Sequence, residues 1–276
     1  MLDQQIKIAR DLGVAATFDI EAEIARRIAF LADYLRSARG RAYVLGISGG
    51  VDSLTAGLLA QSAVERLRAT GYAATFMAMR LPYGEQRDES DAQKALAVIK
   101  PDRIVTVDIK PATDAMSAQI VSEAAGVFGD ARRDFHNGNI KARQRMVAQF
   151  ALAGAMGGLV IGTDHAAEAL MGFFTKFGDG AADVVPLTGL NKRRVRAIAR
   201  HLGAPPTLVL KTPTADLETE APLKPDEDAL GVSYDDIDDF LEGKEIRPAA
   251  RQRILSIYLG TAHKRALPVP PEQGSG

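Results

Sequence analysis

The sequence contains no cysteine among its 276 residues. This absence excludes disulfides, thiolate metal sites, iron–sulfur clusters and a thiol nucleophile. An excess of charge of one sign is also missing, because 34 Lys and Arg balance 35 Asp and Glu. Broad electrostatic capture of nucleic acid or a membrane is therefore not expected. No apolar signal core or apolar run of bilayer length occurs, so the sequence predicts a cytoplasmic protein.

The composition that is present is typical of a globular protein, with 46% hydrophobic and 25% charged residues. A chain of this length can bury enough surface to fold without covalent staples. No repeat or composition shift forces a second domain. We therefore expect one domain over residues 1–276.

Apolar spacing predicts two kinds of segment. Residues 1–40 read as an N-terminal helical arm, in which Ile20, Ile24, Ile28, Leu31 and Leu35 form one stripe on a helix begun by Asp19 or Thr17. From residue 42, short apolar runs alternate with helical patterns. Strands are predicted at Ala42–Ile47, Ala73–Met79, Ile104–Ile109 and Leu159–Ile161, and helices at Asp52–Ala69, Glu89–Ile99, Asn139–Met156 and Asn191–Leu202.

Alternation of this kind predicts an α/β fold with a doubly wound, mostly parallel sheet covered by helices on both faces. Ligands in such folds bind at the carboxyl ends of the strands. A Pro-rich stretch over residues 204–232 interrupts the alternation and is predicted to be a mobile lid loop. Ser233 is predicted to begin a further helix, and residues 266–276 to form a frayed tail.

The loop after the first predicted strand reads GISGGVDS, residues 46–53. Its glycines allow backbone N–H groups to approach an anion, and the following helix directs its positive end to the same place. The Lys of a Walker A loop is missing, and Asp52 stands in the cradle instead. A carboxylate beside polyphosphate requires a cation between them, so Asp52 indicates Mg²⁺.

A second cluster, GTDHAAE, follows the last predicted strand. Thr163 or Asp164 is predicted to cap the next helix, which places Glu168 one turn further on. Asp52 and Glu168 would then meet at one edge of the sheet, where both can reach one Mg²⁺. His165 is open between a metal ligand or base and a structural residue, and the structural role is favoured.

The SGGVDS loop resembles that of the ATP pyrophosphatase superfamily, also called the PP-loop or adenine nucleotide α-hydrolase-like group. Over about residues 20–265 the chain resembles ammonia-dependent NAD synthetases. The matching stretches include LPYGEQRDE, GNIKARQRM, GTDHAAEALMGFFTKFGDGAADVVPLTGLNKR, PTADLE, LGVSYDDIDDFLEGK and HKR.

This resemblance implies a ligase for the last step of NAD biosynthesis. ATP would adenylate the carboxylate of deamido-NAD, releasing pyrophosphate, and ammonia would then displace AMP. Mg²⁺ would be held by Asp52 and Glu168, with Asp52, Glu168 and Lys192 as catalytic residues. The implied ATP contacts are Gly46, Ile47, Ser48, Gly49, Gly50, Val51, Asp52, Ser53, Arg80, Thr163, Lys192 and Thr214.

For deamido-NAD, the resemblance implies contacts from Arg143, Lys176, Asp183, His263 and Lys264. Phe135, Phe173 and Phe174 could stack on a ring, although anchoring of their own loops is favoured. The resemblance also implies a homodimer with the substrate bound across its interface. The N-terminal helices and the Asn139–Met156 helix are the interface candidates.

Other functions of the same loop stay open at this stage. Enzymes that thiolate tRNA commonly use cysteines and a basic surface, and both are missing here. Amination of guanylate would need a different substrate pocket and a dimerisation domain, for which the chain has no room. A nucleotide-binding protein without catalysis would not need Asp52, Glu168 and Lys192 together. Since glutamine-dependent NAD synthetases use a cysteine in a fused glutaminase domain, the sequence predicts ammonia as the direct nitrogen donor.

Overall fold

The fold is built on four parallel strands. The computed structural model describes residues 2–85, 89–124, 126–128, 132–214 and 225–271. Strands β1 (Ala42–Gly46), β2 (Thr75–Arg80), β3 (Arg103–Thr106) and β4 (Gly158–Val160) form a sheet in the order β3-β2-β1-β4. The chain moves outward from β1 to β3 and then returns to the other side of β1. The strand order therefore reverses beside β1, where an open α/β sheet places its ligand site.

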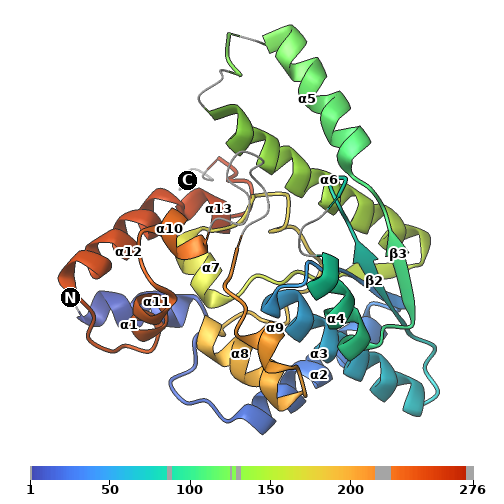
Figure 1. Ribbon diagram of the computed structural model, residues 1–276. Coiled ribbons are helices and arrows are strands. Elements are labelled where there is room, and N and C mark those ends of the chain that lie inside the picture. The colour runs from blue at the N-terminus through green and yellow to red at the C-terminus, as the bar shows by residue number, and fades with distance from the viewer. Residues whose placement is uncertain (1, 86–88, 125, 129–131, 215–224, 272–276) are drawn as a thin grey trace, which may run out of the picture.

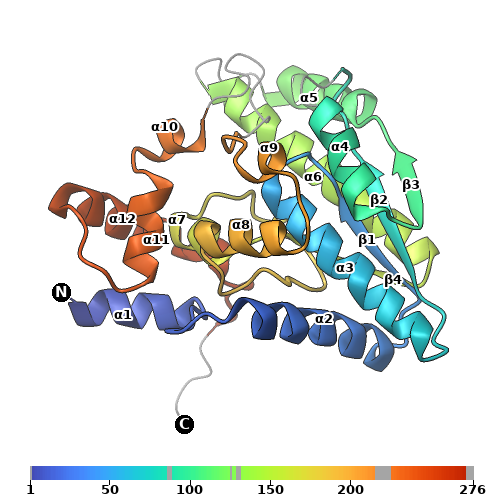
Figure 2. The ribbon, with the colours of Figure 1, turned by 60° about the horizontal axis from the view of Figure 1, so that its bottom comes forward.

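Helices cover both faces of this sheet (Figures 1 and 2). On one face lie α3 (Val51–Ala69) and α4 (Glu89–Ile99), and behind them α2 (Ile20–Ser37) and α8 (Lys192–His201). On the other face lies α6 (Arg133–Ala155), with α5 (Lys110–Ala124) packed along it. The predicted doubly wound α/β fold is confirmed.

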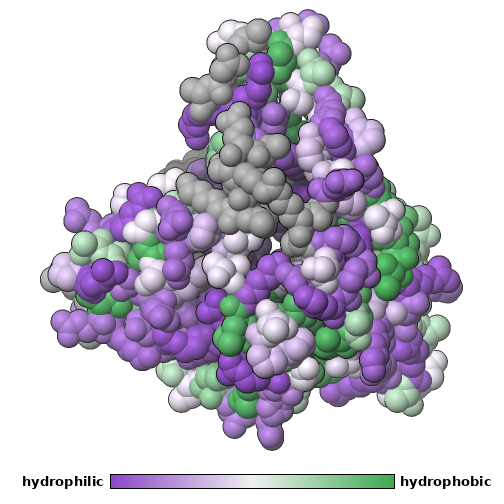
Figure 3. Space-filling view, viewed as in Figure 1, coloured by the Kyte–Doolittle hydropathy of each residue, from purple (hydrophilic) through white to green (hydrophobic). Residues whose placement is uncertain are grey.

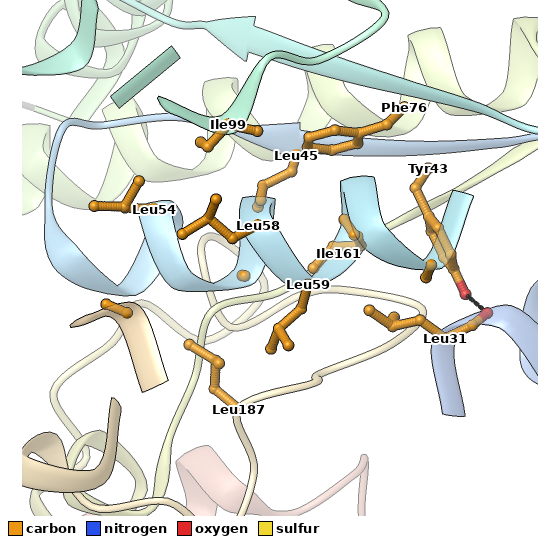
Figure 4. Packing of buried hydrophobic residues seen from close by; sticks show 14 of the residues in the cluster. Leu31, Tyr43, Leu45, Leu54, Leu58, Leu59, Phe76, Ile99, Ile161 and Leu187 are labelled. Carbon is orange, nitrogen blue, oxygen red and sulfur yellow. Dashed lines mark hydrogen bonds between the residues drawn. The ribbon is translucent and has the colours of Figure 1, made fainter. Parts of the chain in front are cut away.

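Alternation along β1 explains this two-sided packing. Tyr43 and Leu45 point into the cluster under α3, while Val44 points into the cluster under α6, as successive strand residues must. The Tyr43 hydroxyl donates to the carbonyl of Leu31 at 2.7 Å and so ties α2 to the sheet core (Figure 4). Leu31 and Leu35 are fully buried there, which confirms the apolar stripe. Asp19 is the N-cap of α2, as one of the two predicted alternatives.

A second hydrophobic cluster lies beside the sheet and its helices. It joins α1 (Leu2–Asp11), α7 (Ala166–Met171), α11 (Tyr234–Leu241) and α12 (Pro248–Gly260). The N-terminal arm thus divides between two cores, because α2 packs on the sheet and α1 packs on α11. The buried Gln5 side chain fixes α1 by donating to the carbonyl of Phe240 at 2.8 Å.

Several predicted boundaries are wrong. Helix α6 begins at Arg133, six residues before Asn139, and β3 ends at Thr106, where its pairing with β2 ends. Helix α12 was not predicted. Two short helices, α9 (Pro206–Val209) and α10 (Asp226–Leu230), lie within the predicted 204–232 loop, and α13 (Ala262–Arg265) precedes the predicted tail. The central part of that loop, 215–224, and the end of the tail, 272–276, lie outside the described residues.

The face seen in Figure 3 is largely hydrophilic, with smaller hydrophobic areas between. Within the described parts of the chain, no helix is long and apolar enough to cross a membrane.

Candidate active site

The loop from Gly46 to Ser53 connects β1 to α3 and is held by its own serines. The Ser48 hydroxyl oxygen accepts from the Gly50 N–H at 3.2 Å, and the Ser53 hydroxyl oxygen accepts from the Ser48 N–H at 3.3 Å. Gly49 has φ +87°, and a Cβ there would lie 2.8 Å from the backbone nitrogen of Ala92. Glycine is therefore required at this turn.

The first turn of α3 opens onto a cavity. Its N-cap, Gly50, provides no side-chain hydrogen bond to the helix. The cavity, about 430 Å³ in volume, is lined by Gly46, Asp52 and most of the loop between them. An uncapped helix N-terminus with its N–H groups directed at a cavity is suited to bind an anion.

Four ionisable side chains meet at this turn. A carboxylate oxygen of Asp52 accepts from the Lys192 ammonium at 2.7 Å. The other carboxylate oxygen of Asp52 lies 3.4 Å from Nε2 of His165, which in turn lies 3.7 Å from a carboxylate oxygen of Glu168. The sequence therefore correctly predicted that Asp52 and Glu168 share one edge of the sheet.

The two acids have opposite pKa shifts. Burial alone would raise the pKa of Asp52, but the charge and hydrogen bond of Lys192, with a further contribution from nearby His165, outweigh it and lower the pKa. For Glu168, burial and then the charge of Asp52 raise the pKa well above its ordinary value. Burial likewise raises the pKa of Asp164 to about 7, with the charges of Asp179 and Asp52 adding to the effect. The site thus concentrates acidic groups that a cation would stabilise in their charged forms.

His165 is the N-cap of α7, so the predicted cap at Thr163 or Asp164 is wrong. Its Nδ1 accepts from the Glu168 N–H at 3.3 Å. Because Nδ1 accepts, the neutral ring carries its proton on Nε2, between the two carboxylates. Burial lowers the pKa of His165 although the charge of Asp52 opposes the shift. A neutral, capping His165 agrees better with the structural role that the sequence favours than with a role as a metal ligand.

Lys192 is the first residue of α8, and its backbone is fixed from outside the helix. The Asp238 carboxylate accepts from the N–H groups of Lys192 and Arg193 at 3.0 and 2.7 Å. The N-cap Asn191 accepts from the Arg194 N–H at 2.9 Å. Three N–H groups of the first turn are thus satisfied, and the fully buried Lys192 side chain points at Asp52.

Most of the predicted ATP contacts line one cavity. Gly49 shapes the loop but does not line the cavity. Residues 211–214 and 226 also line the cavity. The predicted residues on the cavity are Gly46, Ile47, Ser48, Gly50, Val51, Asp52, Ser53, Arg80, Thr163, Glu168, Lys192, Thr214 and Lys264.

Arg80 lies on the cavity, but its guanidinium holds the loop. It donates to the carbonyl of Ile47 and to a carboxylate oxygen of Glu89 at 2.6 Å. The side chain is buried at 2% exposure. The structure thus gives Arg80 a scaffold role, and its contact with ATP stays a prediction.

The predicted deamido-NAD residues divide into two groups. Lys264 lines the cavity and donates to the carbonyls of Gly172 and Phe174, both at 2.8 Å. Beside it, Arg143 donates to the carbonyl of Lys176 at 3.1 Å, and Lys176 donates to the carbonyl of His263 at 2.5 Å. These three residues form a basic cluster next to Lys264 without lining the cavity.

Asp183 lies apart from that group. Its carboxylate accepts from the Val160 N–H at 2.7 Å and fixes the end of β4. It does not line the cavity of this chain, so its predicted contact with substrate is untested.

Sequence reasoning missed two polar residues of α6 that face the site. Gln149 accepts from the Gly46 N–H at 2.8 Å, and Arg145 donates to the carbonyl of Leu81 at 3.0 Å. Both line the cavity, as do Phe135, Phe173 and Phe174. The four-residue spacing of Arg145 and Gln149 places them on one helix face, which is the signal that could have identified them.

Comparison with known proteins gives consistent matches. A family model described as NAD synthase matches residues 23–268. An NH(3)-dependent NAD(+) synthetase of Burkholderia ambifaria is 62% identical over 265 residues, covering 96% of this chain and 94% of that protein. A crystal structure of NAD+ synthetase from Burkholderia pseudomallei has a TM-score of 0.84 at 60% identity and 97% coverage of both chains.

A more distant structure has the same fold. It is an NMN synthetase from Francisella tularensis, with a TM-score of 0.80 and 34% identity, covering 93% of this chain and 100% of that one.

Proposed function

The chain belongs to the NAD synthase family, and from this premise we propose that it is a ligase that forms NAD from deamido-NAD and ammonia with ATP. The observation that carries the proposal is the meeting of Asp52, Glu168 and Lys192 at the open N-terminus of α3. Two carboxylates beside an anion-binding loop are suited to bind a cation that accompanies a phosphorylated ligand. A buried ammonium in contact with one of them can stabilise negative charge as it develops.

In the first step we assign the ATP phosphates to the Gly46–Ser53 loop. A carboxylate oxygen of deamido-NAD attacks the α-phosphorus, and the bond to the β-phosphate oxygen breaks. Pyrophosphate leaves with that electron pair, and an acyl adenylate remains. Lys192 is fixed at its backbone and side chain, so it needs little rearrangement to stabilise the charge on the reacting phosphate.

The residues present fit Mg²⁺. An oxygen of Asp52 and Nε2 of His165 are buried without a hydrogen-bond partner, and one ligand atom each of Asp52, His165 and Glu168 lie within 4.8 Å of one another. Because Mg²⁺ prefers oxygen ligands and Nε2 carries the histidine proton, Asp52 and Glu168 would hold the ion. When bound, it would neutralise phosphate charge and favour departure of pyrophosphate.

In the second step ammonia attacks the acyl carbon of the adenylate. The carbon–oxygen bond to AMP breaks, AMP leaves with the electron pair, and the nitrogen loses one proton to give the nicotinamide. The adenylate must be kept from water, which would return the acid and waste ATP. The enclosed walls from Phe173, Phe174 and residues 211–214 supply part of this shielding.

For the acceptor, we propose that Lys264 and the cluster of Arg143, Lys176 and His263 bind the phosphates and carboxylate of deamido-NAD. Three of these four residues lie beside the cavity of one chain, which supports a substrate that extends beyond it. Exposed apolar side chains on α2 and α6, including Phe30, Tyr34 and Val147, support the proposed homodimer. Sedimentation equilibrium should give twice the mass of the chain, and a monomer at micromolar concentration would contradict the dimer.

The decisive assay supplies ATP, Mg²⁺ and ammonium with deamido-NAD. We expect NAD, AMP and pyrophosphate in equal amounts, and little NAD when glutamine replaces ammonium in the presence of this chain alone. Asp52→Ala should lower the rate by about 10³-fold, as expected when a key electrostatic group is removed. A rate no higher than that of Asp52→Ala would refute the proposal.

A parallel assay offers nicotinate mononucleotide, because the Francisella protein of the same fold is an NMN synthetase. Faster formation of NMN than of NAD would reassign the acceptor and leave the chemistry intact. ATP binding without substrate-dependent release of pyrophosphate would instead indicate a nucleotide-binding protein.

A further inference from the structure

Tyr234 lies behind the cavity wall and touches Lys192. The Lys192 ammonium is 5.0 Å from the centre of the Tyr234 ring, while it donates to Asp52 at 2.7 Å. Tyr234 is buried at 4% exposure and does not line the cavity. A ring face at this distance attracts an ammonium, and more strongly when both groups are away from water.

The same tyrosine binds a third acid near Lys192. Its hydroxyl donates to the Asp226 carboxylate at 3.0 Å, and Asp226 lines the cavity. Burial lowers the pKa of Lys192, but the charges of Asp52 and Glu168 and, more weakly, Asp226 raise it. Lys192 and Asp226 thus contact the same tyrosine, Lys192 at the ring and Asp226 at the hydroxyl.

The position of Tyr234 is fixed, because the start of α11 is held by hydrogen bonds. The Tyr234 N–H donates to the Glu227 carboxylate at 2.7 Å, and Ser233 caps the helix. One turn further along the same face of α11, Asp238 holds the backbone N–H of Lys192. One helix face thus contacts Lys192 at both its backbone and its ammonium.

We propose that Tyr234 is a positioning residue for Lys192. Its ring supports the ammonium and its hydroxyl occupies Asp226, so that Lys192 pairs with Asp52 at the phosphate loop. This inference rests on the proposed function for its catalytic consequence, whereas the placement of the ammonium can be tested without turnover.

The kinetic test uses Tyr234→Phe, which keeps the ring and removes only the hydroxyl. Asp226 then loses a donor and attracts Lys192 away from Asp52. We expect kcat to fall about tenfold, as a displaced catalytic group allows, with a much smaller change in KM for ATP. Adding Asp226→Asn should restore most of the rate, because a neutral amide does not compete for the ammonium. Asp226→Asn alone provides the reference for this double variant.

Tyr43→Phe is the matched control, since it also removes a buried tyrosine hydroxyl that bonds to the protein, but in the sheet core. We expect a similar fall in melting temperature and an unchanged kcat. If Tyr43→Phe lowers kcat as much as Tyr234→Phe does, general destabilisation explains the result and the proposal fails. It also fails if the double variant is no faster than Tyr234→Phe.

A readout independent of turnover is the NMR signal of the Lys192 side chain in ¹³C-lysine-labelled protein, assigned by its loss in Lys192→Met. The Tyr234 ring should shift this signal upfield. It should move in Tyr234→Phe and return in the double variant. An unmoved signal in Tyr234→Phe would overturn the proposal, whereas a wild-type protein that makes no NAD but shows these shifts would refute only the proposed function.

Discussion

Two helix N-termini meet at the Asp52–Lys192 ion pair. One has a first turn without a side-chain cap, and the other has a first turn whose N–H groups are capped by side chains. Helix α3 starts at a glycine whose side chain cannot cap it, so its first turn faces the cavity. Helix α8 starts with three N–H groups already bound, two by Asp238 and one by Asn191. The open terminus is suited to receive an anion, whereas the closed terminus only presents a side chain.

The two termini also differ in how far along the sequence the residues that hold them lie. The serines that shape the α3 turn lie within five residues of the groups they bind. Asp238 lies 46 residues from Lys192 and belongs to the second hydrophobic region around α11. One half of the ion pair is therefore built locally, and the other half depends on the packing of α8 against α11.

The largest effect is expected from breaking the open terminus with Gly49→Ala. A residue with a Cβ at φ +87° costs about 1–2 kcal/mol of the free energy of unfolding. The contact with the Ala92 backbone adds about 1–3 kcal/mol, because that atom cannot move aside cheaply. Chemical denaturation should measure the sum, and kcat should fall with it because the loop is displaced.

Gly203→Ala is the matched control. Gly203 has the same φ of +87°, but a Cβ there would meet nothing within 4 Å. It should show only the conformational cost and keep wild-type kinetics. Equal losses of stability in the two variants would show that the close approach of α4 does not constrain the loop.

A smaller effect is expected from opening the closed terminus with Asp238→Asn. The amide has one acceptor oxygen for two N–H groups, so one of them loses its partner. We expect a loss of about 1–2 kcal/mol of unfolding free energy and a lower kcat from a less fixed Lys192. Unchanged stability would contradict the capping role.

The same variant has a pH signature. Burial raises the pKa of Asp238 to about 6 although the Arg193 and Lys192 N–H groups lower it. The native state therefore binds this proton at a higher pH than the unfolded chain does, and the contribution of Asp238 to stability rises as the pH falls from 7 to 4. The stability difference between wild type and Asp238→Asn should be larger at pH 4.5 than at pH 7, and a smaller difference would refute the shift.

This contrast explains what the sequence could predict. The parallel sheet, the loop at 46–53 and the placement of Asp52 and Glu168 follow from local spacing and from the rule that strand ends share an edge. Lys192 was identified through the family resemblance, but its supports were not. Asp238 was only one of several acids in an acidic helix, and only tertiary packing selects it.

His165 and Gln149 show the same limit at shorter range. A histidine is an uncommon N-cap, so Thr163 and Asp164 were better candidates by local preference. The orientation of β4 and α7 placed the cap one or two residues later. The spacing of Gln149 and Arg145 places both on one face of α6, but it does not predict that Gln149 accepts from the Gly46 N–H, which lies 103 residues away in the sequence.

The smallest effect is expected from Arg193→Met, which separates the backbone cap from the ion pairs beside it. Arg193 is half-exposed and reaches Asp239 of α11 at 3.0 Å and Glu242, the C-cap of α11, at 2.9 Å. Exposed ion pairs contribute about 0–1 kcal/mol and weaken in salt, while the backbone N–H that binds Asp238 is unaffected. We expect a loss of stability below that of Asp238→Asn, further reduced in 1 M NaCl, with wild-type kcat. A loss equal to that of Asp238→Asn would show instead that side-chain ion pairs, rather than the cap, join α8 to α11.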